Sequence, residues 1–355
     1  MIIRLRTPMC VAVLLTLIAG SSVAADRSRD EYEFNDTKTF EVGANPDVSV
    51  RTISGDITYT GSDTETATVR MTIVVRADNE EEAERIRDAI DLTLDGGDGF
   101  LDLRVEYPHD DFHRWLRREF GKNCSISVNF DVRGPEDAEG ELSSVSGDIE
   151  LDNSGSMAVG TVSGDVTVDD VAGRLQANSV SGSVTVTGCT GRARTESVSG
   201  DILVERCGGD LSAHSTSGNV EASGIDGSVD GGTVSGRLIL RDIGGEVSAS
   251  TTSGDITVEH QSGDLTIETI SGDVRARSMS EARLSATSLS GTIEIAVRAD
   301  AIGEISLETF SGDIETDAPV KVRRQSRRRL IGRMGDGNGR LEIETHSGDI
   351  IVSSL

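Results

Sequence analysis

The pair Ser-Gly recurs at nearly constant spacing through the middle of this chain, and this period constrains the fold more than any other feature. Its serines stand at positions 146, 163, 181, 199, 217, 235, 253 and 271, so the steps are one of 17 residues and six of 18. A fixed period of this size is typical of a solenoid, in which each coil buries its apolar face only against its neighbours. The spacing therefore predicts stacked coils from Ser146 to Gly272.

Within each coil, apolar and polar residues alternate. The second residue after each glycine and the residue two further on are nearly all aliphatic, as in Val184 and Val186. Half a repeat later a second glycine recurs, as at Gly191 and Gly209. Period-two alternation predicts strands, and recurrent glycine predicts turns between them. We therefore expect an all-β, single-chain β-solenoid that resembles a parallel β-helix, with two short strands per coil of about 18 residues.

The first 25 residues have the pattern of a secretory signal peptide. Arg4 and Arg6 precede an apolar run at 11–19, and small residues follow up to Ala25. The apolar run is shorter than the roughly 20 residues that a membrane-spanning helix needs, and no later segment approaches that length. We therefore expect an exported mature chain without a transmembrane segment, located in the periplasm, on the cell surface or outside the cell.

Composition and motifs divide the mature chain into two further regions. The segment Thr52 to Tyr59 already carries the coil motif, which indicates an early first coil. Asn79 followed by Glu82 predicts the start of a short helix, with strands expected on either side. We therefore expect a signal peptide at 1–25, a small α+β N-terminal cap with the first coil at 26–140, and the β-solenoid repeat domain at 141–355.

The chain is strongly acidic. It has 61 Asp and Glu against 34 Lys and Arg, and removing Arg4 and Arg6 with the signal peptide leaves 61 against 32, a net charge of −29. Such a surface repels nucleic acid and anionic lipid at long range, so no nucleic-acid partner is expected. It suits either simple solubility or the uptake of divalent cations.

Two cysteines lie one coil apart, at Cys189 and Cys207. Stacked strands are about 4.7–4.9 Å apart, which is within the Cα separation that a disulfide tolerates. An exported protein folds in an oxidising compartment. The pair is either a disulfide or two small buried side chains in one core column.

An aspartate follows many of the Ser-Gly pairs. A column of carboxylates at strand spacing would offer oxygen ligands to calcium, and calcium is the one cofactor that the sequence admits. Aspartate is also a common turn residue, because its side chain makes local hydrogen bonds. The candidate calcium ligands are Asp148, Asp165, Asp201, Asp255 and Asp273.

A hydroxyl residue stands two positions before the serine in all twelve Ser-Gly pairs that carry the coil motif, from Thr52 to Thr345. If the intervening residue, usually Val, points inward, these hydroxyls and the serines of the pairs form two outward rows. Such rows either stabilise the stacked strands by hydrogen bonding or provide a flat polar face that recognises glycan or ice.

Two shorter features have weaker implications. His109 and His113 are four residues apart, which on a helix would place both on one face as zinc ligands, although Pro108 indicates a surface loop instead. The run 321–333 is rich in arginine, and with Arg340 it carries eight basic residues. This run either binds phosphate-bearing surface polymers or forms terminal strands that pair with acids of neighbouring coils.

The serial Val-Ser-Gly-Asp-Ile/Val coils, the late Gly335-Asp336-Gly337 turn and the closing segment Leu341 to Ile350 resemble the bacterial putative adhesin family, a domain of unknown function. The resemblance covers about residues 38–355. It implies a β-solenoid and an adhesin-like role, and it implies no catalytic residues.

No pattern of a catalytic site stands out. The sequence has no Gly-Lys-Ser/Thr phosphate loop, and no histidine recurs beside a Ser-Gly pair as a base beside a nucleophile would. We expect an exported, non-enzymatic structural or interaction module of the cell envelope, with an envelope polymer, glycan or protein as partner. The alternatives are a periplasmic scaffold or envelope-stress accessory protein, and a carbohydrate-active β-helix enzyme.

Overall fold

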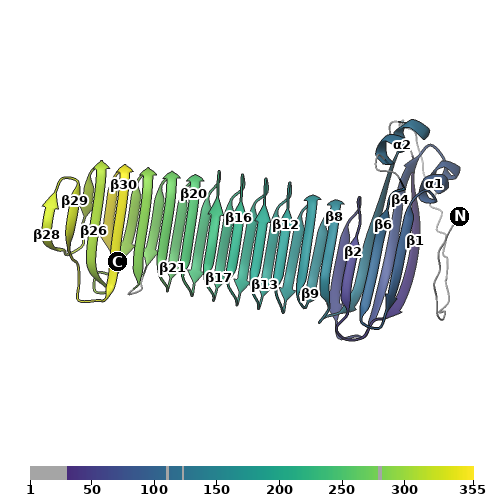
Figure 1. Cartoon of the computed structure of the whole chain (residues 1–355), viewed down its shortest axis with the longest axis horizontal. Helices are drawn as coiled ribbons and strands as arrows, with labels where there is room; N and C mark the ends of the chain where they lie inside the picture. The colour runs from purple at the N-terminus through teal and green to yellow at the C-terminus, as the bar shows by residue number, and fades with distance from the viewer. Residues whose placement is uncertain (1–29, 109–111, 122–123, 279–281) are drawn as a thin grey trace. The chain divides into compact units, whose positions relative to one another are not determined.

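The computed structural model describes residues 30–108, 112–121, 124–278 and 282–355 (Figure 1). The expected signal peptide at 1–25 lies outside the described residues. The chain divides into two compact units, unit 1 up to Gly164 and unit 2 from Asp165 to Leu355. Each unit is built almost entirely of β-strands, so the predicted all-β class is confirmed.

Unit 1 combines long strands with two short helices. In its first sheet the strand order is β1-β4-β7-β3-β9, and in its second sheet the order is β5-β6-β2-β8-β10. The elements are β1 (Asp30–Glu41), β2 (Asp47–Arg51), β3 (Ile57–Ser62), β4 (Thr66–Ala77), α1 (Glu80–Arg87), β5 (Asp91–Gly97), β6 (Phe100–Glu106), α2 (Phe112–Glu119), β7 (Ser125–Pro135), β8 (Glu139–Ser146), β9 (Ile149–Ser154) and β10 (Met157–Ser163).

The early coil motif forms a coil, as its sequence predicts. β2 and β3 pair in parallel with β8 and β9, and the paired residues are 92 positions apart in the chain. The predicted helix is also present as α1. The Asn79 side chain accepts a hydrogen bond from the Glu82 amide at 2.9 Å, which is the expected N-terminal cap. Sequence-local capping therefore placed the helix correctly.

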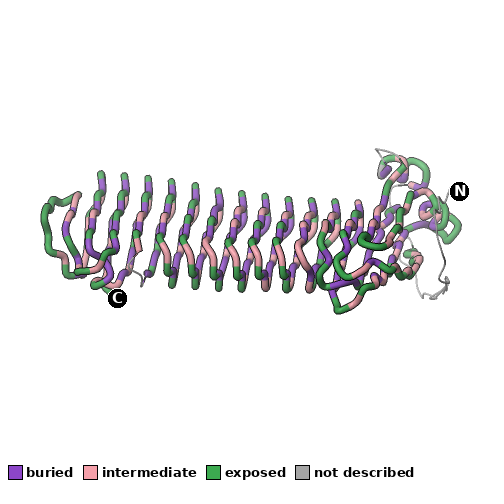
Figure 2. The backbone as a smooth tube through the Cα atoms, turned by 60° about the horizontal axis from the view of Figure 1, so that its bottom comes forward, coloured by how far each residue is buried: buried purple, intermediate pink, exposed green. Residues whose placement is uncertain are grey.

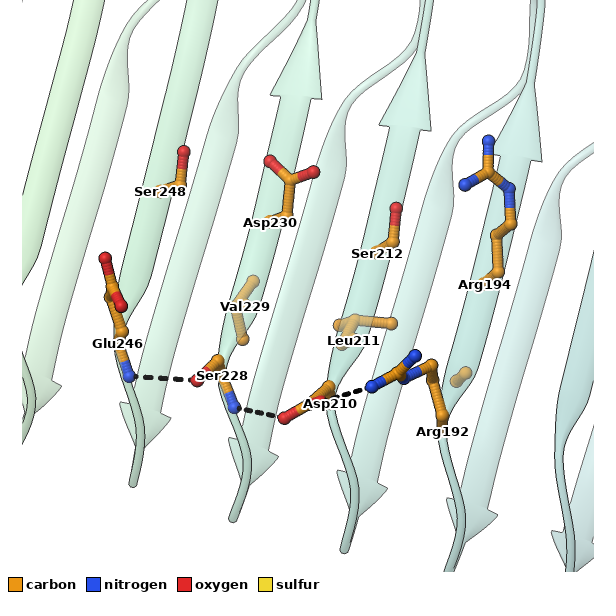
Figure 3. A pocket seen from close by; sticks show the side chains of 11 residues that line it. Arg192, Arg194, Asp210, Leu211, Ser212, Ser228, Val229, Asp230, Glu246 and Ser248 are labelled. Atoms are coloured by element: carbon orange, nitrogen blue, oxygen red, sulfur yellow. Dashed lines mark hydrogen bonds and ion pairs between the residues drawn. The ribbon is translucent and has the colours of Figure 1, made fainter.

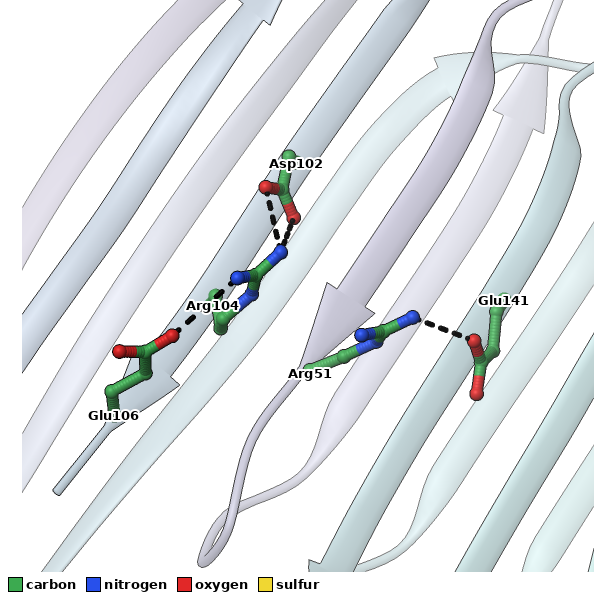
Figure 4. Close-up of polar contacts among 5 residues, drawn as sticks. All are labelled: Arg51, Asp102, Arg104, Glu106 and Glu141. Carbon is green, nitrogen blue, oxygen red and sulfur yellow. Dashed lines mark hydrogen bonds and ion pairs between the residues drawn. The ribbon is translucent and has the colours of Figure 1, made fainter.

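The solvent face of the second sheet in unit 1 is crossed by ion pairs (Figure 4). Arg51 on β2 contacts Glu141 on β8 at 2.9 Å, while Arg104 on β6 lies between Asp102 and Glu106 of its own strand, at 3.1 and 3.4 Å. All five side chains are partly exposed, so each pair contributes at most about 1 kcal/mol to stability.

Unit 2 is a β-solenoid of two parallel sheets. Sheet A has the order β11-β13-β15-β17-β19-β21-β23-β25-β31-β27, and sheet B has the order β12-β14-β16-β18-β20-β22-β24-β30-β26-β29-β28. Sheet A contains β11 (Val166–Val171), β13 (Val184–Cys189), β15 (Ile202–Cys207), β17 (Val220–Ile225), β19 (Leu238–Ile243), β21 (Ile256–Gln261), β23 (Val274–Ser278), β25 (Ile293–Val297), β27 (Ile314–Thr316) and β31 (Ile350–Ser354). Sheet B contains β12 (Leu175–Ser179), β14 (Ala193–Ser197), β16 (Leu211–Ser215), β18 (Val229–Thr233), β20 (Val247–Ser253), β22 (Leu265–Ser271), β24 (Arg283–Ser290), β26 (Ile302–Ser311), β28 (Lys321–Ser326), β29 (Arg329–Arg333) and β30 (Gly339–Ser347).

Equivalent residues of successive coils pair directly, so the core consists of columns. Val184 lies opposite Ile202 and Val186 opposite Val204, each 18 residues apart. These aliphatic side chains are at most 1 % exposed. Figure 2 shows the same alternation of buried and exposed backbone in coil after coil of unit 2. Burial of each aliphatic side chain stabilises the fold by about 1.5–3 kcal/mol.

The last coil departs from sequential stacking. β30 pairs on one side with β24 and on the other with β26, and β31 likewise lies between β25 and β27. The final segment of the chain is therefore inserted between two earlier coils. The expectation that each coil lies on the preceding one is wrong here, because the Ser-Gly period carries no information about the order of equivalent coils.

A column of left-handed residues forms a further corner that the sequence did not reveal. It includes Asp170, Arg206, Asp242 and His260, whose φ angles lie between 48° and 57°. Residues with side chains rarely adopt this conformation, and Asn and Asp tolerate it best. The corner was not recognised in the sequence because its residue types differ from coil to coil. Only Gly188 and Gly224 in this column are glycines, the residue that usually signals a left-handed turn.

Candidate functional site: an exposed apolar ridge

The Ser-Gly corner has the opposite orientation from the one we expected. All twelve hydroxyl residues from Thr52 to Thr345 are buried, with exposed fractions of 2–6 %. The residue between the hydroxyl and the following Ser-Gly, usually Val, is exposed instead in eleven of the twelve coils, and Ile53 is half-buried. The predicted outward position of this hydroxyl column, and with it the polar recognition face built from two rows, is therefore wrong.

Hydrogen bonds to backbone explain why the hydroxyls point inward. Ser197 Oγ accepts from the Gly200 amide at 2.9 Å within its own coil and donates to the Gly182 carbonyl of the preceding coil at 3.1 Å. Ser215 repeats both contacts one coil later. A Cβ on Gly200 would stand 1.9 Å from the Gly182 oxygen, so only glycine fits there. The inward hydroxyl thus satisfies buried backbone groups at the turn.

The exposed residues of this corner form one column on unit 2, which we call the ridge. It follows the order of the strands in sheet B, and neighbouring members come from hydrogen-bonded strands. At its last step the rings of His346 and Phe310 are stacked with centroids 4.8 Å apart, close to the spacing of adjacent strands. The ridge consists of Val180, Val198, Thr216, Val234, Thr252, Ile270, Leu289, His346 and Phe310.

The ridge concentrates the exposed apolar side chains of the molecule. Among the described residues, eleven large hydrophobic side chains are exposed, and six of them belong to the ridge. Two more, Val145 and Val162, occupy the same motif position in unit 1. Exposure within the ridge increases from 42 % at Val180 to 65 % at Phe310. A contiguous exposed apolar surface of this kind marks an interaction site more often than isolated apolar residues do.

Acidic side chains flank the ridge. On one side are the exposed serines of the Ser-Gly pairs and then Asp201 and other members of the aspartate column, and on the other side are Glu196 and Glu268. Arg237 replaces the aspartate in one coil. The ridge is therefore an apolar line with a largely negative border, which favours a partner that is both apolar and basic.

The aspartate column serves the turns. Asp165 Oδ1 accepts the Ser183 amide of the next coil at 2.8 Å, and Asp201 Oδ1 accepts the Asn219 amide at 2.7 Å. Asp255 and Asp273 continue the same ladder at 3.0 and 2.9 Å. Within unit 1, Asp148 donates its amide to Asp56 Oδ1 at 2.9 Å. Over the described residues, no group of three or more His, Cys, Asp or Glu side chains is placed to hold a metal ion. Calcium binding therefore stays a prediction.

Cys189 and Cys207 lie opposite each other in β13 and β15, and both are buried. Their thiols are not bonded to each other. The hydrogen bond between the two sulfurs, together with burial, raises the pKa of the Cys189 thiol, and the same hydrogen bond lowers the pKa of Cys207. The geometry places the two side chains together in one core column, and the disulfide remains a prediction.

The other candidates from the sequence differ in their outcome. His109 lies outside the described residues, as does the side chain of His113, so the zinc hypothesis stays a prediction. The basic run forms the terminal antiparallel strands β28 and β29. Two of its arginines pair with acids of neighbouring coils, Arg327 with Asp313 at 2.9 Å and Arg329 with Glu308 at 3.4 Å. Arg327 also lowers the pKa of the Asp313 carboxyl.

An open depression of about 410 Å³ lies on the solvent face of sheet B (Figure 3). Small residues such as Ser212, Ser228 and Ser248 create it, and Arg192 pairs with Asp210 at its border at 3.0 Å. Next to it, His214 lies 3.5 Å from Ser212 Oγ and 3.8 Å from an oxygen of Asp230. Both distances exceed those of an activated serine, which are about 2.6–3.2 Å.

The backbone amides around this Ser-His-Asp group are not free to stabilise an oxyanion. Ser212 lies within the register of β14, β16 and β18, where the backbone amides belong to the parallel ladder. Acyl transfer needs free amides directed at the reacting oxygen. This cluster could not be recognised in the sequence, because its members come from two coils. Its arrangement is that of polar side chains on the outer face of a sheet.

Among the described residues, no helix is both long and apolar enough to cross a membrane. A comparison with curated proteins found no match. Solved structures that match this chain in a comparison include a putative adhesin from Bacteroides fragilis, with 15 % identity, a TM-score of 0.30, and coverage of 90 % of this chain and 97 % of the other. A putative adhesin from Parabacteroides merdae has 12 % identity, a TM-score of 0.31, and coverage of 74 % and 95 %.

A third similar structure, a putative lipid binding protein from Parabacteroides distasonis, has 12 % identity, a TM-score of 0.25, and coverage of 74 % and 93 %. The Toastrack DUF4097 family profile matches residues 133–243 and 245–353, which together are well over half of the sequence. Both matched segments consist of the coils described above. The chain therefore belongs to the Toastrack DUF4097 family, as its resemblance to putative adhesins predicted.

Proposed function

We infer that this chain is an exported, non-enzymatic interaction module of the cell envelope, adhesin-like in the sense that it holds an elongated partner along the ridge. The observation that carries this proposal is the orientation of the Ser-Gly corner. A polar residue between the hydroxyl and the serine would not disturb the core. Eight coils nevertheless place Val, Ile, Leu or Phe there, exposed to solvent.

The repeated geometry explains how such a surface would bind. Each coil offers one apolar side chain at the strand spacing of about 4.8 Å, so an extended partner meets the same contact several times. Contacts made by one linked partner add up to an avidity far above that of a single contact. The acidic border selects for positive charge. A partner that carries apolar and basic side chains along an extended polypeptide suits this surface. Because alternate residues of such a chain recur about every 6.6–6.8 Å, its apolar side chains meet the ridge at several coils but not at every one.

The proposal of a non-enzymatic role rests on the sheet faces. The one Ser-His-Asp group described above has long contacts and lies on a ladder whose amides are committed to strand pairing. The open depression beside it exposes small polar side chains and salt bridges, as a solvated sheet face does. Incubation of the purified protein with envelope glycans should therefore release no fragments.

A peptide that alternates lysine and valine is a direct probe of the ridge. The test variant is Val198→Thr, Val234→Thr and Ile270→Thr combined, because native Thr216 and Thr252 show that the corner tolerates threonine. Loss of three apolar contacts should weaken binding about 10- to 100-fold. A peptide alternating glutamate and valine, which the acidic border repels, should not bind.

Equal binding of the lysine-valine peptide by the native protein and the triple variant would remove the ridge from the proposal. A matched control combines Thr185→Ser, Thr257→Ser and Thr266→Ser, which changes outward positions of the sheets away from the ridge and should leave binding unchanged. Fractionation of cells that produce the chain tests export, and recovery of the mature protein in the cytoplasm would contradict it.

A further inference from the structure

Each unit has two sheet edges, each formed by a strand with a single partner. In unit 1 these strands are β1, which pairs with β4, and β5, which pairs with β6. In unit 2 they are β27, which pairs with β31, and β28, which pairs with β29. Among the described residues, none of the four strands forms a ladder on its other side. An open edge presents unpaired backbone N–H and C=O groups and is a template for another strand.

The β28 edge is basic. Lys321, Arg323 and Arg324 lie on it, and all six of its residues are exposed. The sequence contains no acid between Asp317 and Asp336. Over the part of the chain that the structure describes, none of the three basic residues forms an ion pair within 4.0 Å, in contrast to Arg327 in the adjoining turn. Positive charge on this edge is therefore available to a partner.

The β1 edge is acidic. Asp30, Glu31, Glu33 and Asp36 occupy its first seven residues, and no basic residue lies among them. Glu31 contacts Arg76 of the neighbouring β4 at 3.1 Å. Asp30 and Glu33 are exposed. β5 is also acidic, with Asp91 and Asp95, but it carries fewer charges, and β27 has only three residues. Of the four open edges, β28 is thus the basic one and β1 the one with the most acids.

We propose that β28 of one copy pairs with β1 of a second copy. Charged residues on an edge normally prevent strand pairing, and here each edge repels another edge of its own kind. β28 attracts the acidic edges, and β1 carries the most opposite charge, so charge favours this pairing over the others that are available. Main-chain hydrogen bonds between the strands then hold the two copies together. Because the interface joins two different surfaces, it repeats head to tail and allows assemblies of more than two copies.

The contact is expected to be weak. β28 has six residues, so at most six residues of each strand pair, and the surface buried falls below the roughly 1,200 Å² of a stable interface. Much of the attraction is between solvent-exposed charges, which salt screens over about 8 Å at physiological ionic strength. Association should therefore depend on both protein concentration and salt.

Analytical ultracentrifugation of the full mature chain tests this proposal. In about 20 mM salt the mean mass should increase with protein concentration, and in about 500 mM salt it should return to that of one chain. Two charge-reversal variants identify the edges. Arg323→Glu with Arg324→Glu changes β28, and Glu33→Lys with Asp36→Lys changes β1; each variant alone should stay monomeric.

A mixture of the two variants provides the decisive result. The reversed β28 is acidic and fits the reversed β1, while the unchanged edges still fit each other, so the mixture should associate like the native protein. Misfolding cannot produce this rescue. A matched control, Arg192→Glu with Arg194→Glu, makes the same charge change on the face of sheet B and should associate normally.

Three outcomes would overturn the proposal. The first is a native chain that remains monomeric at low salt and high concentration. Association that persists in both charge-reversal variants would place the contact elsewhere. A mixture that stays monomeric would exclude pairing between these two edges. None of these results bears on binding of the lysine-valine peptide by the ridge.

Discussion

Ser197 Oγ donates a hydrogen bond across the coil boundary to the carbonyl oxygen of Gly182, at 3.1 Å. Ser197 Oγ also accepts a hydrogen bond from the Gly200 amide, so one buried hydroxyl satisfies backbone groups of two coils. This contact turns the hydroxyl inward and leaves Val198 outside. The core of the Ser-Gly corner is therefore polar, and its surface is apolar.

Replacing the buried hydroxyl should destabilise the solenoid. Ser197→Ala leaves the Gly200 amide and the Gly182 carbonyl without this partner, and we expect a loss of about 1–3 kcal/mol in the free energy of unfolding. Ser197→Thr keeps the hydroxyl, as native Thr233 does, and should cost much less. Urea unfolding of both variants measures the difference, and equal losses would show that the hydroxyl contributes nothing.

The aspartate ladder predicts a different response at the neighbouring position. Asp201→Ala removes the acceptor of the Asn219 amide and should cost about 1 kcal/mol. Asp201→Asn keeps an acceptor oxygen, as native Asn219 does toward the Arg237 amide at 2.9 Å, and should be nearly neutral.

Calcium distinguishes the two roles of this column. If the aspartates serve the turns alone, millimolar calcium leaves the melting temperature of the native chain unchanged. A calcium-dependent rise that Asp201→Asn abolishes would instead establish an ion site.

Thr195 offers a stabilising substitution. Its side chain is fully buried between Ala177 and Ala213 of the adjacent strands, and its hydroxyl has no hydrogen-bond partner among the described residues. Valine has nearly the same shape without the unpaired hydroxyl. Thr195→Val should raise the free energy of unfolding by about 1 kcal/mol. Thermal unfolding measures it, and a lower melting temperature would indicate that the hydroxyl is satisfied in solution.

The cysteine pair predicts a redox dependence. In the oxidised exported protein we expect Cys189 and Cys207 to form a disulfide across adjacent coils, because their side chains already occupy one column. Intact mass before and after reduction tests this, with Cys189→Ala as the matched control. Free thiols in protein isolated from its own compartment would establish the alternative, two small core residues.

Alkaline pH should unfold unit 1 through its tyrosines. Burial raises the pKa of Tyr107 to about 12 and raises the pKa of Tyr59 as well. Tyr59 also donates to the Pro135 carbonyl at 2.8 Å. A raised pKa in the folded state means that this stability is complete below the ordinary tyrosine value of about 10 and is lost as pH rises above it.

Phenolate absorbance, followed together with circular dichroism, measures this effect. We expect ionisation of Tyr59 to coincide with unfolding. Tyr59→Phe removes the titrating group and should shift the alkaline transition to higher pH. A phenolate signal that is complete near pH 10 in a fully folded protein would contradict the buried environment.

Much of the fold could be read from local patterns. The period of the Ser-Gly pairs predicts the coils, and alternation predicts which of Val184 and Thr185 faces the core. The Asn79 cap predicts α1. The left-handed corner was missed, because Asp170, Arg206 and His260 share a backbone conformation and no residue type.

The candidate site could be predicted only in part. The repeats in the sequence identify the column of hydroxyl residues. The expectation that Val198 is buried and the hydroxyl of Ser197 exposed was wrong, because the structure shows the reverse. Hydrophobicity alone favours valine inside. The structure reverses this because a buried corner without the Ser197 hydroxyl would leave amide and carbonyl groups unsatisfied, which costs more than the exposure of one valine side chain.

The sequence by itself determined the repeating unit, the alternation of its strands and the sign of the surface charge, because these depend on residues close together in the chain. Tertiary structure decided the orientation of the Ser-Gly corner, the insertion of β30 and β31 between earlier coils, and the placement of acidic β1 and basic β28 at open edges. Those features depend on which equivalent strands pair, and identical repeats leave that choice to long-range packing.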